Sequence, residues 1–116
     1  MVLHLVLKAQ WYNMIEQGIK KEEYREIKQY WMHRLMLCHC YGFRPCKYES
    51  CAAPMPNLCH GIIKEFDEVC FHYGYTSRTM TFKIESICVE KGKPEWGAED
   101  GKQYFVIKLG ERIKED

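Results

Sequence analysis

Apolar residues that recur with a period of two in the C-terminal half constrain this chain more than any other feature. The alternation is clear in residues 79–89 and returns in residues 103–109. A period of two is typical of a β-strand with one buried face, so we expect a strand in each segment. A third strand is expected at residues 68–73, and the glycines between the three segments supply turns. This half of the chain therefore predicts a β-meander.

The N-terminal residues predict one more strand followed by a short helix. Residues 2–7 form a nearly continuous apolar run, which is typical of a strand buried on both faces. The period then changes, and Trp11, Met14 and Ile15 fall on one side of a helix. Gly18 follows where a residue in the left-handed conformation would end that helix.

The next segment is highly charged, and its composition alone would permit a helix. Because Gly18 ends a helix so close by, we expect residues 20–27 to be extended. A second amphipathic helix is then expected through about Leu37. The residues expected to form its stripe are Ile27, Tyr30, Trp31, Arg34 and Leu35.

Residues 38–60 differ in composition from the rest of the chain and read as an irregular Cys-rich excursion. Three prolines interrupt the segment, so regular structure is not expected there. Thiolates and imidazoles are the ligands of structural Zn²⁺, so a subset of its cysteines could hold one. None of the spacings is Cys-x-x-Cys, which keeps free thiols packed under a loop as the alternative. The candidate metal ligands are Cys38, Cys40, Cys46, Cys51 and Cys59.

Length and composition predict one α+β domain over residues 1–116, with about five to six strands in a barrel, two short helices and the Cys-rich loop. A net charge of +1 excludes strong non-specific DNA binding through a broad basic surface. No apolar run is long enough to span a membrane, and no signal peptide is visible. We therefore expect a cytoplasmic protein with reduced cysteines and no membrane partner.

The segment from Gly18 to Arg25 carries the sharpest motif, G-x-K-x-x-E-x-R, with Lys20 and Glu23 at its two inner positions. This motif resembles the signature of the ASCH domain family, in the small single-domain bacterial or phage type. The resemblance extends over residues 2–37 and 64–113. It implies a PUA-like mixed β-barrel whose charged cleft binds RNA or a modified nucleoside.

Glu23 and Arg25 lie two positions apart on an expected strand, so they share a face and can brace each other. Lys20 has the opposite parity and joins them only if the chain turns before Glu22. In such a cluster Lys20 would attract an anion, Glu23 would be a general-base candidate and Arg25 would orient a ligand. The alternative is an exposed strand with surface ion pairs. The residues expected to bind the ligand are Lys8, Gly18, Arg25, Tyr75 and Arg78.

Several functions are compatible with this pattern. The first is an RNA- or nucleoside-binding module, and the second is a ribonuclease acting on single-stranded RNA through Lys20 and Glu23. A nucleoside amidohydrolase is a further alternative, although Glu23 stands where related amidohydrolases have their threonine. The last is an adaptor that contacts a protein partner through residues 38–60, ordered by zinc.

Trp96 is expected to close the barrel in preference to stacking on a base.

Overall fold

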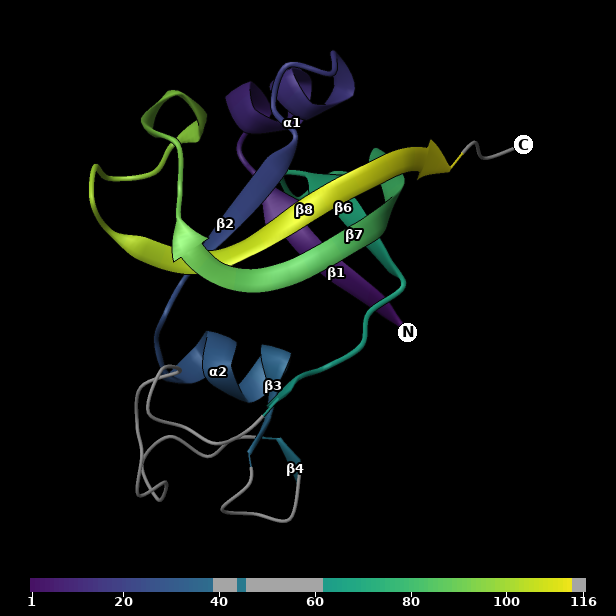
Figure 1. Cartoon of the computed structure of the whole chain (residues 1–116). Coiled ribbons are helices and arrows are strands. Elements are labelled where there is room, and N and C mark those ends of the chain that lie inside the picture. The colour runs from purple at the N-terminus through teal and green to yellow at the C-terminus, as the bar shows by residue number, and fades with distance from the viewer. Residues whose placement is uncertain (39–43, 46–61, 114–116) are drawn as a thin grey trace.

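The computed structural model describes residues 1–38, 44–45 and 62–113 of the chain (Figure 1). The architecture is α+β: a curled five-stranded mixed sheet forms a half-barrel, two short helices pack at its ends, and three short strands form a second sheet. The elements in chain order are β1 Val2–Leu7, α1 Ala9–Glu16, β2 Glu22–Glu26, α2 Gln29–Leu35, β3 Met36–Cys38, β4 Arg44–Pro45, β5 Ile62–Ile63, β6 Glu68–Tyr73, β7 Thr79–Lys91, the 3-10 turn η3 Pro94–Trp96 and β8 Gln103–Ile113.

The large sheet has the strand order β1-β6-β7-β8-β2. Its β6, β7 and β8 strands are consecutive antiparallel neighbours, which confirms the predicted β-meander. β1 joins the other side of β6 in parallel, and β2 pairs antiparallel with β8. The charged segment after Gly18 is therefore extended, as expected, and β1 and β2 form the two edges of the half-barrel.

Strand β7 supplies much of the curvature. It pairs with β6 through its first residues and with β8 over most of its length. Its register against β8 shifts between Phe82 and Ile84 and again between Ile84 and Ser86. Such bulges bend a strand and increase its twist. They allow β7 to pair with both β6 and β8 in a curled sheet.

The burial of β1 differs from its prediction. Leu3, Leu5 and Leu7 are buried in the core, whereas Val2 and Val6 are exposed. The expectation of a strand buried on both faces is therefore wrong, because no layer within the described residues covers the outer face of β1. Residues 2–7 form a nearly continuous apolar run in the sequence because two of the exposed positions of β1 carry valine.

Strand β8 shows the opposite departure. The pattern predicted one buried face, but Tyr104, Phe105, Val106 and Ile107 are all buried. Phe105 and Ile107 belong to the main core, whereas Tyr104 and Val106 join Tyr24 in a smaller second cluster. The curled sheet thus buries β8 on both faces.

Both helices differ from their predictions: α1 buries a different set of residues, and α2 ends earlier. In α1 the buried residues are Tyr12 and Ile15, and Trp11 is only partly buried. Helix α2 ends at Leu35 and strand β3 starts at Met36, so the expected helical end near Leu37 is wrong. In α2 the core receives Met32 and Leu35, which frees the other face of the helix for a different role.

Strand β3 pairs antiparallel with both β4 and β5. Most of the Cys-rich excursion lies outside the described residues, and β4 is the part of it that the structure places beyond Cys38. None of the helices in residues 1–38 and 62–113 is long and apolar enough to cross a membrane.

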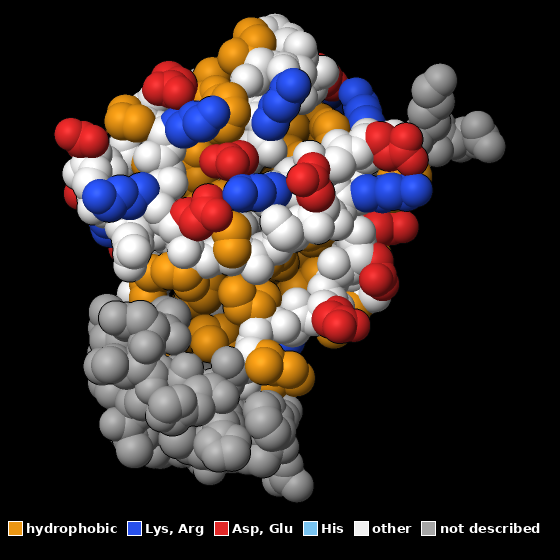
Figure 2. All heavy atoms as spheres, viewed as in Figure 1, with side chains coloured by type: hydrophobic (Ala, Val, Ile, Leu, Met, Phe, Trp, Pro, Cys, Tyr) orange, Lys and Arg blue, Asp and Glu red, His pale blue; other side chains and the backbone are white. Residues whose placement is uncertain are grey.

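The outer face of the sheet is heavily charged. Basic and acidic side chains are interspersed over the face formed by β2, β7 and β8, and hydrophobic side chains lie between this face and α2 (Figure 2). Lys108 of β8 pairs with Glu90 of β7 at 3.2 Å, and Lys83 pairs with Glu111 at 3.0 Å. These ion pairs are solvent-exposed.

Candidate ligand-binding groove

Two arginine side chains span the opening between the edges of the half-barrel. Arg25 of β2 donates from Nη2 to the carbonyl of Val6 at 3.2 Å, and Arg34 of α2 donates from Nη2 to the carbonyl of His4 at 3.4 Å. Both carbonyls belong to the free edge of β1, where backbone groups otherwise lack a ladder partner. The opening is therefore bridged by side chains and not by strand pairing, which leaves space between β1 and β2.

A groove of about 650 Å³ occupies this space, a size typical of small-molecule sites. All three tryptophans of the chain line it, namely Trp11, Trp31 and Trp96. Six basic residues but only three acidic ones line it, although the whole chain is nearly neutral. The basic residues are Lys8, Lys20, Arg25, Lys28, Arg34 and Lys102.

A buried charge cluster forms the base of the groove. Lys20 is 2% exposed and Glu23 is 4% exposed, and they are the two charged residues in the core of the described chain. The Nζ atom of Lys20 donates to Oε1 of Glu23, while Nη1 of Arg25 donates to Oε2 at 2.6 Å. One carboxylate thus holds two cations.

Local backbone geometry explains why Lys20 reaches this cluster despite its parity. Gly18 adopts φ +78°, the left-handed conformation expected after α1. The backbone N–H groups of Ile19 and Lys20 then donate to the carbonyl of Met14 at 2.9 and 3.1 Å. β2 begins only at Glu22, so the chain turns before the strand and the condition set by the sequence is met.

Burial lowers the pKa of Lys20, although its hydrogen bond and charge interaction with Glu23 act in the opposite direction. Its Nζ atom lies 5.2 Å from the ring centre of Trp11 and 5.3 Å from that of Tyr24. Among the described residues, Glu23 is its hydrogen-bond acceptor, and an ammonium has three donors. Lys20 can therefore donate to a ligand without losing Glu23.

Trp31 contacts two guanidinium groups. The Cζ atoms of Arg25 and Arg34 each lie 5.2 Å from its ring centre, and Arg34 also lies 5.8 Å from the ring of Tyr30. Cation–π contacts of this kind hold planar groups in fixed positions. Helix α2 therefore forms one wall of the groove through Tyr30, Trp31 and Arg34, and Trp31 also packs against the main core.

The loop that carries Trp96 forms the opposite wall and is anchored by two tyrosine hydroxyls. Tyr24 accepts from the backbone N–H of Lys93 at 3.0 Å, and Tyr104 accepts from that of Glu99 at 2.9 Å. Burial raises the pKa of Tyr24, so its hydroxyl stays protonated. It donates to Glu22 at 2.8 Å.

Gly97 allows this loop to pack closely against α1. Its φ is +99°, and a Cβ atom added there would lie 3.0 Å from the ring of Trp11. A larger residue would therefore displace Trp11 as well as strain the backbone. Trp96, which was expected from the sequence to close the barrel, packs against the second core cluster and also lines the groove.

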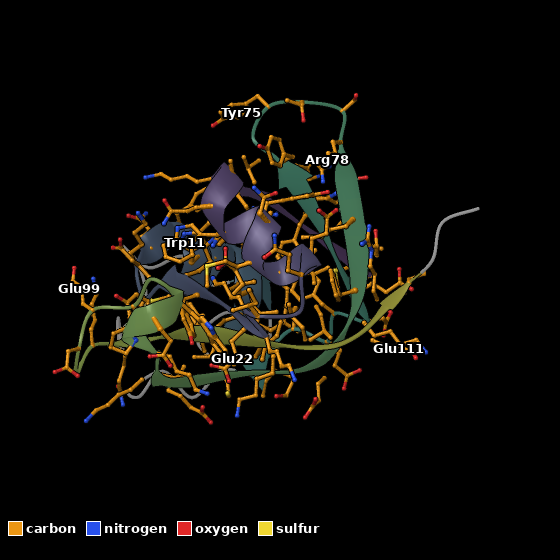
Figure 3. The ribbon with its side chains drawn as sticks, turned by 90° about the horizontal axis from the view of Figure 1, so that it is seen from above. Trp11, Glu22, Tyr75, Arg78, Glu99 and Glu111 are labelled. Atoms are coloured by element: carbon orange, nitrogen blue, oxygen red, sulfur yellow. The ribbon has the colours of Figure 1, made fainter. Side chains whose placement is uncertain are left out.

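The structure brings together most, but not all, of the residues expected to bind a ligand. Lys8, Arg25 and Tyr75 line the groove with the Lys20–Glu23 pair. Tyr75 is 99% exposed at the tip of the connection between β6 and β7 (Figure 3). Gly18 lies in the turn after α1 and does not line the groove.

Arg78 lies apart from this group. It donates from Nη2 to both carboxylate oxygens of Glu16 at 2.8 and 3.0 Å, and it covers the rings of Tyr12 and Tyr73. It is not among the residues that line the groove. Its position after the β6–β7 turn suggested a groove residue, but the carboxylate of α1 holds its guanidinium on the other side of the helix.

Reasoning from sequence missed the wall formed by α2. Tyr30, Trp31 and Arg34 were assigned to the amphipathic stripe of a helix, and all three line the groove. Trp31 also packs against the main core, as its place in the stripe predicts. An arginine within an apolar stripe was the available signal, because a charged residue seldom faces a core.

Metal ligands were expected among the cysteines of residues 38–60, whose side chains lie outside the described part of the structure. A different group, His4, Cys70 and His72, could hold a metal ion, since its three ligand atoms lie within 4.8 Å of one another. Cys70 and Cys88 are free thiols on strands, and both are partly buried.

No family model matches the chain, and comparisons with curated proteins and with solved structures found no match.

Proposed function

We propose that this protein is an ASCH-like, PUA-like domain that binds single-stranded RNA or a modified nucleoside in the groove between β1 and β2. The observation that carries the proposal is the buried Lys20–Glu23–Arg25 cluster at the base of a groove lined by every tryptophan in the chain. A buried ion cluster is a poor device for stability alone. Placed under an open groove, it is suited to recognise a polar ligand.

Each part of the groove matches a part of a nucleotide. Bases stack on aromatic rings, which the tryptophans provide, and phosphates pair with basic side chains, which the walls provide. Lys20 would donate to a base oxygen or phosphate, and Glu23 would position it. The modest net charge favours a ligand held inside the groove over a long duplex lying on the surface.

Tyr75 supports a ligand that extends out of the groove. An almost fully exposed tyrosine stabilises no core, and it stands at the rim of the groove on a turn. Exposed aromatic platforms of this kind stack the next base of a single strand. The position favours single-stranded RNA over a free nucleoside as the physiological ligand.

Ribonuclease activity is a second candidate, favoured by one observation. Burial lowers the pKa of Lys20, and a lysine with a lowered pKa gives up its proton more readily than an ordinary one. Glu23 is engaged by two cations, so it would act as a positioning residue before it acted as a base. Under this alternative Lys20, and not Glu23, carries the proton transfer.

The test mixes the protein with end-labelled single-stranded RNA, in Mg²⁺ or in EDTA, and follows band shift and fragment length in one gel. We expect wild type to shift intact RNA, and Lys20→Ala and Glu23→Gln to release it. Lys21→Ala is the matched control, since Lys21 is the exposed neighbour that does not line the groove. Fragments that disappear in Lys20→Ala would establish the ribonuclease instead.

Tryptophan fluorescence then separates a nucleoside from RNA. Because all three tryptophans line the groove, an occupant of the groove should quench or shift nearly the whole emission. Nucleosides are titrated alongside an RNA oligomer of the same base composition. If neither ligand shifts a band or changes the emission, the proposal is wrong.

A further inference from the structure

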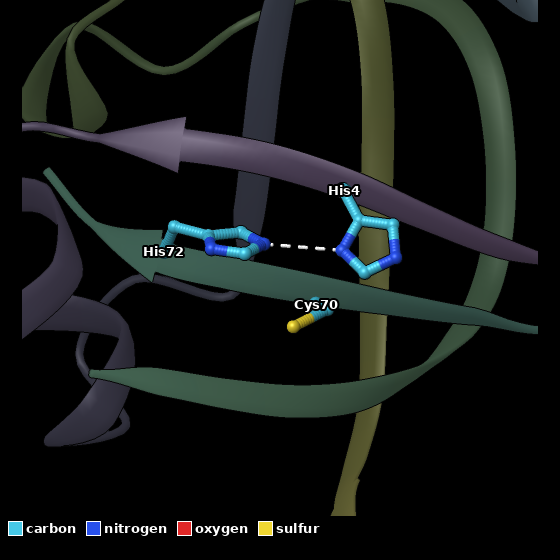
Figure 4. Close-up of side chains that lie close together, drawn as sticks. All are labelled: His4, Cys70 and His72. Atoms are coloured by element: carbon cyan, nitrogen blue, oxygen red, sulfur yellow. Dashed lines mark hydrogen bonds between the residues drawn. The ribbon is translucent and has the colours of Figure 1, made fainter. Parts of the chain in front are cut away.

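We propose a second binding site on the outer face of the sheet, where His4, Cys70 and His72 bind one Zn²⁺ ion. The site is separate from the cysteines of residues 38–60 and does not depend on the function proposed for the groove. It lies across the junction of β1 and β6, far apart in the chain but adjacent in the sheet (Figure 4).

Strand register places the three side chains on one face. His4 of β1 lies directly opposite Cys70 of β6 in the parallel pair, and His72 lies two residues farther along β6. Their neighbours Leu3, Leu5, Val69 and Phe71 face the core, so the three ligands point to the other side. Alternation along two paired strands thus presents three donors to one point.

The separation of the donors suits a metal ion. Nδ1 of His4 lies 3.1 Å from Nε2 of His72, and all three ligand atoms lie within 4.8 Å of one another (Figure 4). Two imidazole nitrogens bound tetrahedrally to Zn²⁺ at about 2.0–2.1 Å are roughly 3.3 Å apart. The two ring nitrogens therefore already lie at nearly the separation of two zinc ligands, and the rings would turn slightly to face the ion while the Cys70 sulfur moved closer.

The contact between the two rings needs a hydrogen atom or a metal ion between the facing nitrogens. At this distance two imidazole lone pairs would repel unless a proton or a metal lies between them. A proton serves in the metal-free protein, with one ring as donor and the other as acceptor. Zn²⁺ would take the place of that proton, which would shift to the other nitrogen of the donor ring, and the Cys70 thiol would release its own proton to solvent as it binds.

The donor set selects the kind of metal. Two imidazoles and a thiolate favour Zn²⁺ and related late first-row ions, whereas Mg²⁺ and Ca²⁺ require oxygen ligands. Three protein ligands leave the fourth position to water, and His4 is exposed on that side. The ion would fasten β1, an edge strand, to β6. It would also steady the groove, because the carbonyl of His4 accepts from Arg34.

The test uses Co²⁺ as a spectroscopic substitute for Zn²⁺ in the reduced full-length protein. Co²⁺ bound tetrahedrally with a thiolate gives visible absorption together with a sulfur-to-metal charge-transfer band. We expect one equivalent to bind in a variant in which Cys38, Cys40, Cys46, Cys51 and Cys59 are all serine. Zn²⁺ should then displace it.

Single substitutions in the wild-type background keep the test decisive if that variant does not fold. His72→Gln and Cys70→Ser should each lower the bound Co²⁺ by one equivalent, and Cys70→Ser should remove this site's charge-transfer band. Cys88→Ser, at the other described free thiol, should change neither. Unchanged stoichiometry in both ligand variants would overturn the proposal and leave a simple histidine–histidine hydrogen bond.

Discussion

Two lysines of this protein each pair with a glutamate, yet their pKa values move in opposite directions. At Lys108, on the outer face of β8, the hydrogen bond to Glu90 raises the pKa of the ammonium. At Lys20, burial lowers the pKa even though Glu23 accepts its hydrogen bond. The residue types are the same, and the difference is the removal of solvent around Lys20.

This difference distinguishes an ion pair on the surface from an ion pair buried under a groove. A solvent-screened pair contributes little to stability and changes little when it is broken. A buried pair opposes the loss of hydration with its mutual attraction, so removing one partner leaves an uncompensated charge. Substitutions in the cluster under the groove should therefore change stability strongly. The same burial also lowers the pKa of Lys20.

Breaking the buried cluster should have the largest effect. Glu23→Gln leaves Lys20 and Arg25 without their shared carboxylate, and we expect the free energy of unfolding to fall by about 3 kcal/mol or more. Urea denaturation followed by fluorescence measures this change. The matched control is Glu90→Gln, which should produce only a small fraction of the effect because solvent screens that pair. Equal effects at the two positions would mean that the Lys20 cluster is solvated.

The pH dependence of stability should differ in sign between the two lysines. Between the lowered pKa of Lys20 and the ordinary 10.5, the unfolded chain holds a proton that the folded chain does not, so stability rises with pH. At Lys108 the raised pKa stabilises the fold below 10.5, and this contribution is lost as pH rises through the folded value.

Urea unfolding over a pH series, with Lys20→Met and Lys108→Met as references, isolates the two contributions. The stability of wild type relative to Lys20→Met should increase toward alkaline pH. Relative to Lys108→Met it should decrease above 10.5. Parallel curves for wild type and Lys20→Met would contradict a lowered pKa at Lys20.

The smallest effect is expected at Arg78, which was predicted from sequence to bind the ligand. Its guanidinium is exposed and paired with Glu16 outside the groove. Arg78→Ala should therefore leave the affinity for RNA or nucleoside unchanged, measured by the same fluorescence titration. Arg34→Ala, which alters the groove wall, is the contrasting variant. A loss of affinity in Arg78→Ala would show that the ligand extends past Tyr75.

Local pattern was sufficient for most of the elements and for part of the site. The strand expected at residues 68–73 coincides with β6, and the period of two placed β7 and β8 within a few residues of their ends. The same pattern put Glu23 and Arg25 on one face, which their hydrogen bond confirms. It could not show that Tyr104 and Val106 are buried as well, because a second cluster forms only when the sheet curls.

By itself, the sequence determined what depends on neighbours along the chain: the meander, the first strand, the left-handed turn at Gly18 and the pairing of Glu23 with Arg25. Only the tertiary structure decided which strands are neighbours, because the local patterns of β1 and β6 predict two strands but not that they pair in parallel. That pairing brings His4 to His72, 68 residues away. It also places two carbonyls of β1 where Arg25 and Arg34 donate hydrogen bonds to them. These side chains bridge β1 to β2 and α2, and the groove lies in the space between. Period along a strand is a local property, whereas strand order and burial depend on the free energy of the whole fold.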